Sequence, residues 1–345
     1  MTWFESLTGF REASPKQVRE NINVDGETLK SHANGKRMAC GRLETPTLAE
    51  LRERVSSCGR GNGTITVREL VGDVQQLHVD VSNAGSLFQV ASQFNLLEMV
   101  SPSVTPEAGV GIYENDHTQG PACAIACGAG TIYRNYFVSV NDQTGQSANN
   151  QIDCTLDIGN ALGNSANRLW QMRNGYCLAT ESGLVEISDR LRNSSEGHRD
   201  ELRRLLRIGI QWRTQVTVND CEHLVSQAYC SALPVAYSPH SSRLWEPFAR
   251  LVLEASYEAA ICAAIWNSQN NGTNKLFLTL LGGGAFGNDT EWITGAIQRA
   301  VTRYKGVALD VAIVSYHSSS PCVQQLVERF SKCDKQLPPD GRTAK

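Results

Sequence analysis

The chain is 345 residues long, which is enough for one large α/β domain carrying insertions. Hydrophobic residues make up 41% of it and charged residues 19%, a balance that is typical of a folded protein and excludes an intrinsically disordered one. The 32 basic and 35 acidic residues leave a formal net charge of -3 without a long block of like charge, so nucleic acid is not an expected partner.

Residues 1–62 are predicted to form a polar, partly helical extension. The first residues, MTWFESLTGFREASPKQ, lack the apolar stretch behind a basic start that marks a secretory signal. No segment reaches the roughly 18 consecutive apolar residues that a membrane helix needs, so we expect a cytoplasmic protein with no membrane partner. In TLAELRERVSS, the residues Leu48, Leu51 and Val55 recur at spacings of three and four, which indicates a helix over 47–57.

The main domain is predicted to open with two short strands, ITVREL (65–70) and LHVDVSNAG (77–85), separated by a Gly-Asp turn. In SLFQVASQFNLLEM (86–99), apolar residues recur at spacings of three and four, which predicts a helix. A long loop with several prolines and glycines follows over 101–121, and loops of such length are often functional. The small apolar residues of PACAIACGAG (121–130) are then predicted to form a buried strand.

The middle of the chain is predicted to contain an insertion over residues 139–206, whose first part is rich in Asn, Gln, Ser and Gly. Its second part, 183–206, has the pattern of a charged amphipathic helix broken near Gly197. Two strands are predicted after the insertion, over 208–218 and 225–237.

The last third of the domain is predicted as helix, strand, helix and strand. LWEPFARLVLEASYEAAICAAIWNSQ (244–269) reads as a long apolar helix with a proline in its first turn. KLFLTLL (275–281) and VALDVAIVSYH (307–317) are apolar enough to be strands covered on both faces. Between them lie a glycine-rich loop and the helix TEWITGAIQRAVTRY, for which Asp289 or Thr290 is the expected N-cap. Strand, helix and strand in this order form a βαβ unit, so the sheet is expected to be at least partly parallel.

Four glycines, at positions 282, 283, 284 and 287, occupy the loop LGGGAFGND after the first of these strands. Backbone N–H groups without side chains around them can approach a ligand closely, and the following helix adds partial positive charge, so the loop suits a diphosphate. A tight turn that needs positive φ is the alternative, but one or two glycines would satisfy it. No Gly-Lys-Ser follows, so the loop is not a nucleotide-binding P-loop.

Three segments resemble macro domains and occur in the order found in that superfamily. ITVRELVGDVQQLHVDVSNAG resembles its opening, LTLLGGGAFGNDTEWITGAIQRAV its diphosphate loop and the next helix, and VALDVAIVSYH its final strand. The glycine run that usually follows Asn-Ala is missing, and the sequence instead resembles a divergent branch that includes poly(ADP-ribose) glycohydrolases and bacterial effector macro domains acting on ADP-ribosylated arginine. The resemblance implies a three-layer α/β/α fold with a mixed sheet over residues 63–335, followed by a flexible tail over 336–345.

The resemblance also implies a set of ligand-binding residues. Asp73 would accept a hydrogen bond from the adenine amino group, Asn83 would lie near the distal ribose, and Tyr316 would lie beside the adenine. Phe286 would pack on the ribose face. The loop residues around the diphosphate and that ribose would be Gly283, Gly284, Ala285, Phe286 and Gly287.

The expected chemistry is cleavage at the anomeric carbon of the distal ribose, which passes through an oxocarbenium-like state and is assisted by a carboxylate. The expected catalytic acids lie in the long loop or just before it, in the order of preference Asp116, Glu107, Glu98. Glu114 and His117 are expected to be solvated surface groups, as most charged side chains are. Asn95 and Gln119 are expected to hold the substrate, with tying loops together as the alternative role for such amides.

The resemblance implies a hydrolase that removes mono-ADP-ribose from protein side chains, with arginine as the favoured attachment. Its partners would be ADP-ribose and an ADP-ribosylated protein, such as ubiquitin or another arginine-modified protein. A reader that binds ADP-ribose without cleaving it, and an enzyme acting on poly(ADP-ribose) or on a free nucleotide derivative, are the alternatives. No cofactor or metal is expected, because the eleven cysteines fit reduced thiols and the one close pair, Cys123 and Cys127, lacks a second pair to complete a zinc site.

Overall fold

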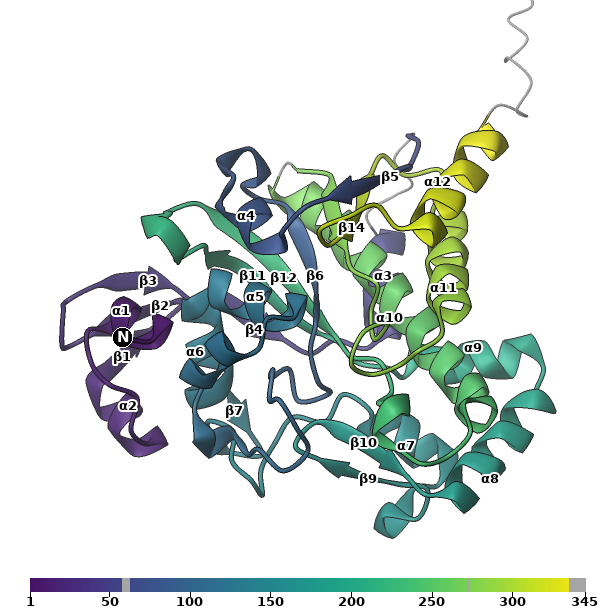
Figure 1. The fold of residues 1–345 in the computed structure, drawn as a ribbon, viewed down its shortest axis with the longest axis horizontal. Coiled ribbons are helices and arrows are strands. Elements are labelled where there is room, and N and C mark those ends of the chain that lie inside the picture. The colour runs from purple at the N-terminus through teal and green to yellow at the C-terminus, as the bar shows by residue number, and fades with distance from the viewer. Residues whose placement is uncertain (58–62, 272, 335–345) are drawn as a thin grey trace, which may run out of the picture.

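A seven-stranded sheet runs through the molecule (Figure 1) in the order β4, β11, β12, β6, β13, β14, β5. The computed structural model describes residues 1–57, 63–271 and 273–334, so the predicted tail 336–345 lies outside the described residues. The strands of this sheet are β4 (Arg42–Glu44), β11 (Gly209–Gln215), β12 (Leu224–Cys230), β6 (Leu87–Ala91), β13 (Lys275–Leu278), β14 (Asp310–Ser315) and β5 (Thr66–Val71).

The sheet is mixed. From β12 to β5 the neighbouring strands pair in parallel, whereas β11 pairs antiparallel with both β12 and β4. The helix α11 (Thr290–Arg303) connects β13 to β14, which confirms the predicted βαβ unit. Asp289 caps this helix, because its side chain accepts a hydrogen bond from the N–H of Glu291 at 2.7 Å.

Helices cover both faces of the sheet, and adjacent residues of β12 show this directly. Ser226 Oγ donates to Asn267 Oδ1 of α10 at 3.1 Å, whereas Gln227 Nε2 donates to the carbonyl oxygen of Cys123 in α5 at 2.8 Å. Successive strand residues point to opposite faces, so the predicted three-layer α/β/α architecture is confirmed. The helices are α3 (Leu48–Ser57), α10 (Ser242–Asn271), α11 and α12 (Pro321–Asp334) on the side of α10, and α4 (Val74–Val79), α5 (Gln119–Ala126) and α6 (Gly128–Tyr136) on the side of α5.

Residues 1–57 contribute elements to the main sheet and its covering helices. They supply its edge strand β4 and the predicted helix α3, and they form a small three-stranded sheet of their own. Phe4, Leu7 and Leu29 share a second hydrophobic cluster with Ile132 and Tyr136 of α6. The elements of this segment other than β4 and α3 are α1 (Trp3–Thr8), α2 (Pro15–Asn21), β1 (Ile22–Asp25), β2 (Thr28–Ser31) and β3 (Arg37–Ala39).

The segment predicted as an insertion forms two hairpins and three helices below the sheet in the view of Figure 1. The predicted broken helix is present as two helices, and the break falls at residues 193–195, where Asn193 ends the first helix and Ser195 caps the second. The elements are β7 (Ser139–Val140), β8 (Gln143–Thr144), α7 (Leu156–Leu162), β9 (Trp170–Arg173), β10 (Tyr176–Ala179), α8 (Glu181–Arg192) and α9 (Glu196–Arg204).

The predicted second strand, 77–85, is wrong. The chain there forms α4 and a single 3₁₀ turn, η1 (Val81–Asn83). Asp73 starts the helix, because its Oδ1 accepts a hydrogen bond from the N–H of Gln75 at 2.7 Å. Val74 and His78 are buried four residues apart, which is helical spacing.

The predicted helix over 86–99 is also wrong. Its first half is the central strand β6, in which Leu87, Phe88, Gln89 and Val90 are all buried. A strand covered on both faces has no polar alternation, so its apolar residues matched a helical spacing by coincidence. The second half of the segment is an irregular loop in which Leu96 has a φ of 66°.

The predicted strand over 121–130 is helical instead, divided between α5 and α6. The small residues of this segment allow α5 and α6 to pack closely against neighbouring elements. A β-carbon on Gly128 would lie 2.7 Å from side-chain atoms of Leu7 and Trp3, and one on Gly130 would lie 2.8 Å from Thr214 Oγ1.

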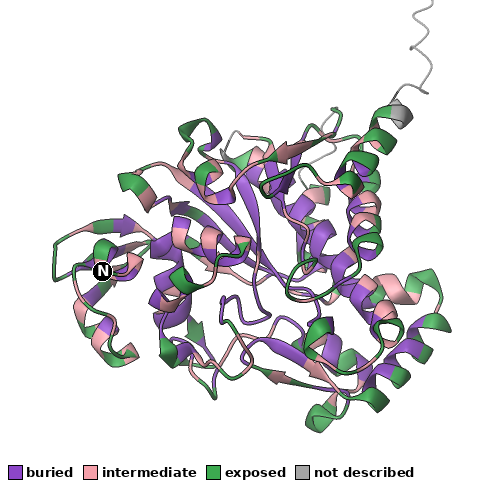
Figure 2. Cartoon of the chain, viewed as in Figure 1, coloured by how far each residue is buried: buried purple, intermediate pink, exposed green. Residues whose placement is uncertain are grey.

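The long helix α10 is buried for most of its 30 residues, and Figure 2 shows buried residues concentrated along it and along the central strands. It begins two residues earlier than predicted, so Pro247 lies in its second turn rather than its first. Proline cannot donate to the carbonyl oxygen of Arg243, and Arg192 Nη2 from α8 donates to it instead at 3.2 Å. Within the described residues, none of the helices is both long and apolar enough to span a membrane.

Candidate functional site

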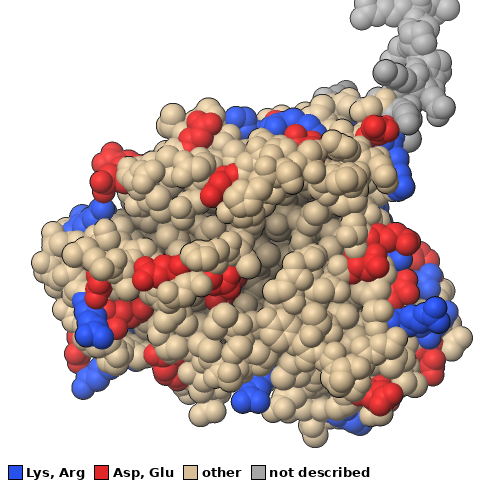
Figure 3. All heavy atoms as spheres, viewed as in Figure 1, with Lys and Arg blue, Asp and Glu red and all other residues tan. Residues whose placement is uncertain are grey.

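A cavity of about 350 Å³ opens at the carboxyl ends of β6, β12, β13 and β14. In α/β proteins, ligands bind at this edge of a parallel sheet. The wall is made by the glycine loop after β13, the residues that follow β6, the start of α5, and aromatic side chains from β10 and from the segment after β12. Figure 3 shows a hollow near the centre of this face, with acidic side chains on one side of it.

The glycine loop forms one wall and is held by the protein around it. Gly282 and Gly287 have φ values of 74° and 67°, so two of its four glycines make the turn. Asn288 Nδ2 donates to the carbonyl oxygen of Leu233 at 2.8 Å. The N–H of Ala236 donates to the carbonyl oxygen of Phe286 at 3.0 Å, which ties the loop to the segment after β12.

Gly284, Ala285 and Phe286 line the cavity, and among the described residues no acceptor bonds their backbone N–H groups. A β-carbon on Gly284 would have no protein atom within 4 Å, so the fold itself does not require glycine there. Free N–H groups and open space together suit an anionic group such as a diphosphate. The reading of the loop as more than a tight turn is thereby supported.

Glu98 lies in the loop after β6 and faces the same cavity. Its side chain is 4% exposed, and Oε1 has no hydrogen-bond partner in the described structure. Burial raises the pKa of this carboxyl well above its usual value; the positive charge of Arg134 opposes the rise, and the negative charge of Asp116 adds to it. Glu98 therefore holds its proton into a pH range in which most glutamates have lost it, as a general acid must.

The loop that carries Glu98 is strained and firmly held. Leu96 has positive φ, an uncommon conformation for a residue with a branched side chain. The side chain of Gln93 binds both backbone groups of Met99, accepting from its N–H at 2.8 Å and donating to its carbonyl oxygen at 3.1 Å. Tyr113 accepts a hydrogen bond from the N–H of Glu98 at 3.0 Å. Strain held by many contacts is common at active sites, so the loop has the character expected of a catalytic segment.

Asp116 lines the cavity at the end of the short helix η3 (Gly111–Asn115). Its Oδ1 accepts a hydrogen bond from the N–H of Thr118 at 2.9 Å. Glu12, which lies between α1 and α2, fixes the segment before Asp116. Its carboxylate accepts hydrogen bonds from the N–H groups of Val110 at 2.9 Å and Gly111 at 2.6 Å. Residues far apart in the sequence therefore position the two acids of the cavity.

Aromatic rings also line the cavity. Tyr176, Tyr237 and Phe286 contact one another, with ring centroids 5.2 to 5.6 Å apart. The predicted residue Tyr316 also lines the cavity and is 41% exposed. Ring faces of this kind suit an adenine or the apolar face of a ribose.

Gln119 lines the cavity, as the predicted role in substrate binding requires, and its Oε1 also accepts from the N–H of Val74 at 3.3 Å. His117 also lines the cavity, although it was expected to be a surface group, and it remains exposed. Gly283 and Gly287 belong to the glycine loop without lining the cavity. Glu114 is an exposed loop acid, as expected.

Glu107 and Asn95 lie outside the cavity. Glu107 is exposed, and its Oε1 accepts a hydrogen bond from the N–H of Ala148 at 2.9 Å. Asn95 is completely buried, donates to Gln151 at 2.8 Å and accepts from the N–H of Leu97 at 3.1 Å. Both side chains tie loops together.

Asp73 and Asn83 also lie outside the cavity. Asp73 is the N-cap of α4, so its carboxylate is engaged by the backbone. Asn83 precedes β6, and its Oδ1 accepts from Lys275 Nζ, at the start of β13, at 3.2 Å. Because β6 and β13 are parallel, Asn83 is at their amino ends, the edge of the sheet opposite the cavity.

Two cavity residues that the sequence did not indicate are Tyr176 and Tyr237. Tyr176 is the first residue of β10, and its hydroxyl donates to the carbonyl oxygen of Met99 at 2.7 Å. Tyr237 ends a segment predicted as a strand, where only the clustering of aromatic and proline residues after β12 hinted at a loop. Neither shows a periodic or motif signal.

Among the described residues, no three His, Cys, Asp or Glu side chains gather as a metal site. The described cysteines are free thiols, most of them buried. Burial raises the pKa of the Cys127 thiol, and also that of Cys123, so neither favours the thiolate form that binds metals.

No protein-family model matches the sequence, and no curated protein matches it. Among solved structures, the chain is similar to the poly(ADP-ribose) glycohydrolase from Deinococcus radiodurans in complex with ADP-ribose, at 13% identity and a TM-score of 0.45, covering 86% of this chain and 95% of that chain. It is also similar to the poly(ADP-ribose) glycohydrolase from Thermomonospora curvata bound to the inhibitor ADP-HPD, at 11% identity and a TM-score of 0.43, covering 91% of this chain and 95% of that chain.

Proposed function

We propose that this protein is an ADP-ribosyl hydrolase that removes mono-ADP-ribose from a protein side chain, with arginine as the attachment. The observation that carries the proposal is a buried carboxyl without a hydrogen-bond partner, Glu98, in the same cavity as the free N–H groups of the glycine loop. The loop binds the diphosphate, which leaves the distal ribose to extend toward the acids. The macro-domain resemblance of the loop and its neighbouring strands supports ADP-ribose as the nucleotide.

In this proposal Glu98 is the first catalytic residue, ahead of Asp116. The bond between the anomeric carbon and the arginine nitrogen breaks, and the proton of Glu98 passes to the departing nitrogen. A water oxygen bonds to the same carbon, and its proton passes to Asp116. Proton exchange with solvent restores both acids, so the net reaction adds one water. Glu107 has no role, because it lies outside the cavity.

The charge of the cavity favours arginine over a polymer. Glu98, Asp116 and His117 are the titratable groups of the acidic end, and no Lys or Arg is found among the described residues that line the cavity. A cationic guanidinium group is attracted to the carboxylate of Asp116, whereas the second diphosphate of poly(ADP-ribose) would be repelled by it. The modified protein, whether ubiquitin or another arginine-modified protein, would then lie over the cavity mouth.

The test is a comparison of substrates and of two matched variants. Arginine-linked, serine-linked, glutamate-linked and polymeric ADP-ribose are each incubated with the protein, and released ADP-ribose is measured. We expect release from the arginine-linked substrate, a fall of at least about 100-fold in Glu98→Gln, and no change in Glu107→Gln. Binding of ADP-ribose with no release from any substrate would identify a reader, and release from the polymer alone would overturn the arginine assignment.

A further inference from the structure

Arg134 of α6 is a buried charge without a salt bridge. Its side chain is completely buried, and within the described part of the chain no carboxylate oxygen lies within 4.0 Å of its guanidinium group. Buried charges are normally paired, because an uncompensated charge in the protein interior is costly. We therefore expect Arg134 to stabilise the negative charge of a nearby group.

Every nitrogen of Arg134 is nevertheless engaged. Nε donates to the carbonyl oxygen of Leu96 at 3.1 Å, and Nη2 donates to Thr131 Oγ1 at 3.1 Å. Nη1 donates to the hydroxyl of Tyr229, and the guanidinium carbon lies 3.7 Å from the centre of the Tyr229 ring. Arg134 is thus fixed from three sides, and one of those sides is the strained loop that carries Glu98.

A chain of hydrogen bonds leads from Arg134 through the core to α4. The Tyr229 hydroxyl donates to Gln227 Oε1, and Gln227 Nε2 lies 3.0 Å from His78 Nε2. His78 Nδ1 lies 2.7 Å from the carbonyl oxygen of Val74. Burial lowers the pKa of His78 to about 4, so this ring is neutral and can donate at Nδ1 while accepting at Nε2. Every donor in the chain then has its acceptor, with the charge kept on Arg134.

Glu98 follows the bonded carbonyl of Leu96 by two residues, and Arg134 is the cation that acts on its carboxyl. The titratable groups that face Glu98 come from each element packed around it: Arg134 of α6, Asp116, Tyr113 and His117 of the loop before α5, Cys123 of α5, Tyr176 of β10 and Tyr229 of β12. Arg134 is the only permanent positive charge in that set.

We propose that Arg134 is a positioning residue for Glu98, which holds the loop that carries this carboxyl and supplies its positive counter-charge. The effect of Arg134 on catalysis depends on the proposed function of Glu98 as the general acid. The hydrogen-bond chain through Tyr229 and Gln227 keeps the guanidinium in place, and Arg134 itself does not touch the cavity.

The experiment measures the ionisation of Glu98 directly, by infrared difference spectroscopy of its carboxyl band against pH, with Glu98→Gln as the blank. Arg134→Met removes the charge at similar length, so the band should titrate roughly one pH unit higher than in the unchanged protein. Arg134→Lys keeps the charge and should titrate close to the unchanged protein while losing turnover. In Arg134→Met, the apparent pKa of the limb of the pH–activity profile that Glu98 governs should rise together with that of the infrared band.

An unchanged titration in Arg134→Met, or an equal shift in Arg134→Lys, would overturn the proposal. If Arg134→Met does not fold, Tyr229→Phe is the second variant, because it removes one acceptor and leaves the charge. It should give a smaller upward shift and a lower turnover number, and a variant with neither effect would also overturn the proposal. The band can be followed without any substrate, so absence of turnover on all four substrates would reject the hydrolase and leave the Arg134 result standing.

Discussion

Gly120 lies directly against Glu98, so that a β-carbon on Gly120 would stand 2.7 Å from Glu98 Oε2 and 2.2 Å from the carbonyl oxygen of Ala91. The first turn of α5 and the end of β6 therefore meet where no methyl group fits. This contact constrains the position of the Glu98 carboxyl, the proposed general acid, in the cavity.

Gly120→Ala should cost about 1 to 3 kcal/mol of unfolding free energy, because the methyl group must displace backbone atoms, and it should lower turnover by displacing Glu98. Urea unfolding and release of ADP-ribose measure the two effects. Gly197→Ala is the matched control, since its β-carbon meets only Ser195 Oγ at 3.8 Å in an exposed helix. A Gly120→Ala protein as active and stable as the control would contradict this view of the site.

Gly284→Val should abolish binding of ADP-ribose while leaving the melting temperature unchanged. The β-carbon of the new side chain would have no protein atom within 4 Å, and the side chain would occupy space beside the free N–H groups of the glycine loop. Calorimetry and thermal unfolding test this pair of results. Gly282→Ala provides the contrast, because its β-carbon would lie 2.4 Å from Ala232 at a φ of 74°, so that variant should unfold more readily. Full binding by Gly284→Val would place the diphosphate elsewhere.

Much of the fold follows from local patterns in the sequence. The strands β13 and β14 and the helices α3, α10 and α11 have either a helical apolar period or an unbroken apolar run next to a glycine loop, and the structure confirms them. The incorrect predictions have separate local causes. β6 is buried on both faces, α5 consists mostly of small residues, and α4 is only six residues long, so none of these three presents a clear period.

The site was less predictable because its parts meet only in three dimensions. The glycine loop could be recognised from its four glycines, but the choice among the acids depended on burial. Glu98 was the third choice because nothing in its neighbouring sequence distinguishes it from Glu107. Tyr176 lies in β10 and Arg134 in α6, and no spacing in the sequence connects them with the cavity or with Glu98.

Glu98→Gln should raise the stability of the protein, increasingly so as pH rises. Burial raises the pKa of Glu98, so the folded state binds this proton more tightly than an unfolded glutamate with a pKa of about 4.3. The stabilising contribution is complete below the unfolded pKa and is lost as pH rises through the folded pKa. The amide cannot ionise, so the variant should gain about 1 kcal/mol at alkaline pH. Thermal unfolding at several pH values measures this, and a gain that does not grow with pH would contradict it.

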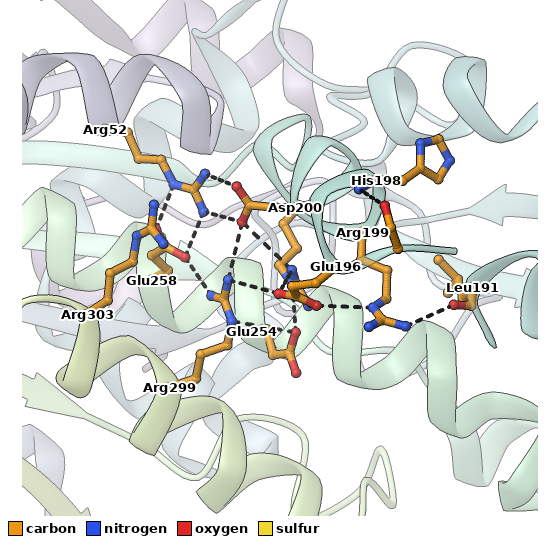
Figure 4. Close-up of polar contacts among 12 residues, drawn as sticks. Arg52, Leu191, Glu196, His198, Arg199, Asp200, Glu254, Glu258, Arg299 and Arg303 are labelled. Carbon is orange, nitrogen blue, oxygen red and sulfur yellow. Dashed lines mark hydrogen bonds and ion pairs between the residues drawn. The ribbon is translucent and has the colours of Figure 1, made fainter. Parts of the chain in front are cut away.

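A partly buried ionic cluster, shown in Figure 4, joins the four helices α3, α9, α10 and α11. Glu258 of α10 is completely buried and contacts Arg52 of α3 at 2.6 Å, and Arg299 and Arg303 of α11 at 2.7 and 2.8 Å. Asp200 of α9 contacts Arg52 at 2.7 Å. Burial alone would raise the pKa of Glu258, but hydrogen bonds from Arg52 and Arg299 hold it below its usual value.

Glu258→Gln should therefore cost about 1.5 to 3 kcal/mol of unfolding free energy, because it removes the buried negative charge with which three arginines pair. The Glu258 carboxylate stabilises the fold fully above the pKa of an unfolded glutamate. This stabilisation is lost as pH falls through the lower pKa that Glu258 has in the folded protein. Glu186→Gln is the control: its partner is the half-exposed Arg168, and such surface pairs contribute little to stability. Equal effects of the two substitutions on urea unfolding would show that the cluster is not structural.

The central claim is that one cavity both binds ADP-ribose and holds the acid that cleaves it. Calorimetric titration of ADP-ribose into the unchanged protein and into Glu98→Gln tests this claim most directly, with the arginine-linked substrate assayed on the same samples. The two proteins should bind ADP-ribose at one site each, and only the unchanged protein should release ADP-ribose from the substrate. No heat of binding in either protein at high concentration, or undiminished release by Glu98→Gln, would contradict the account.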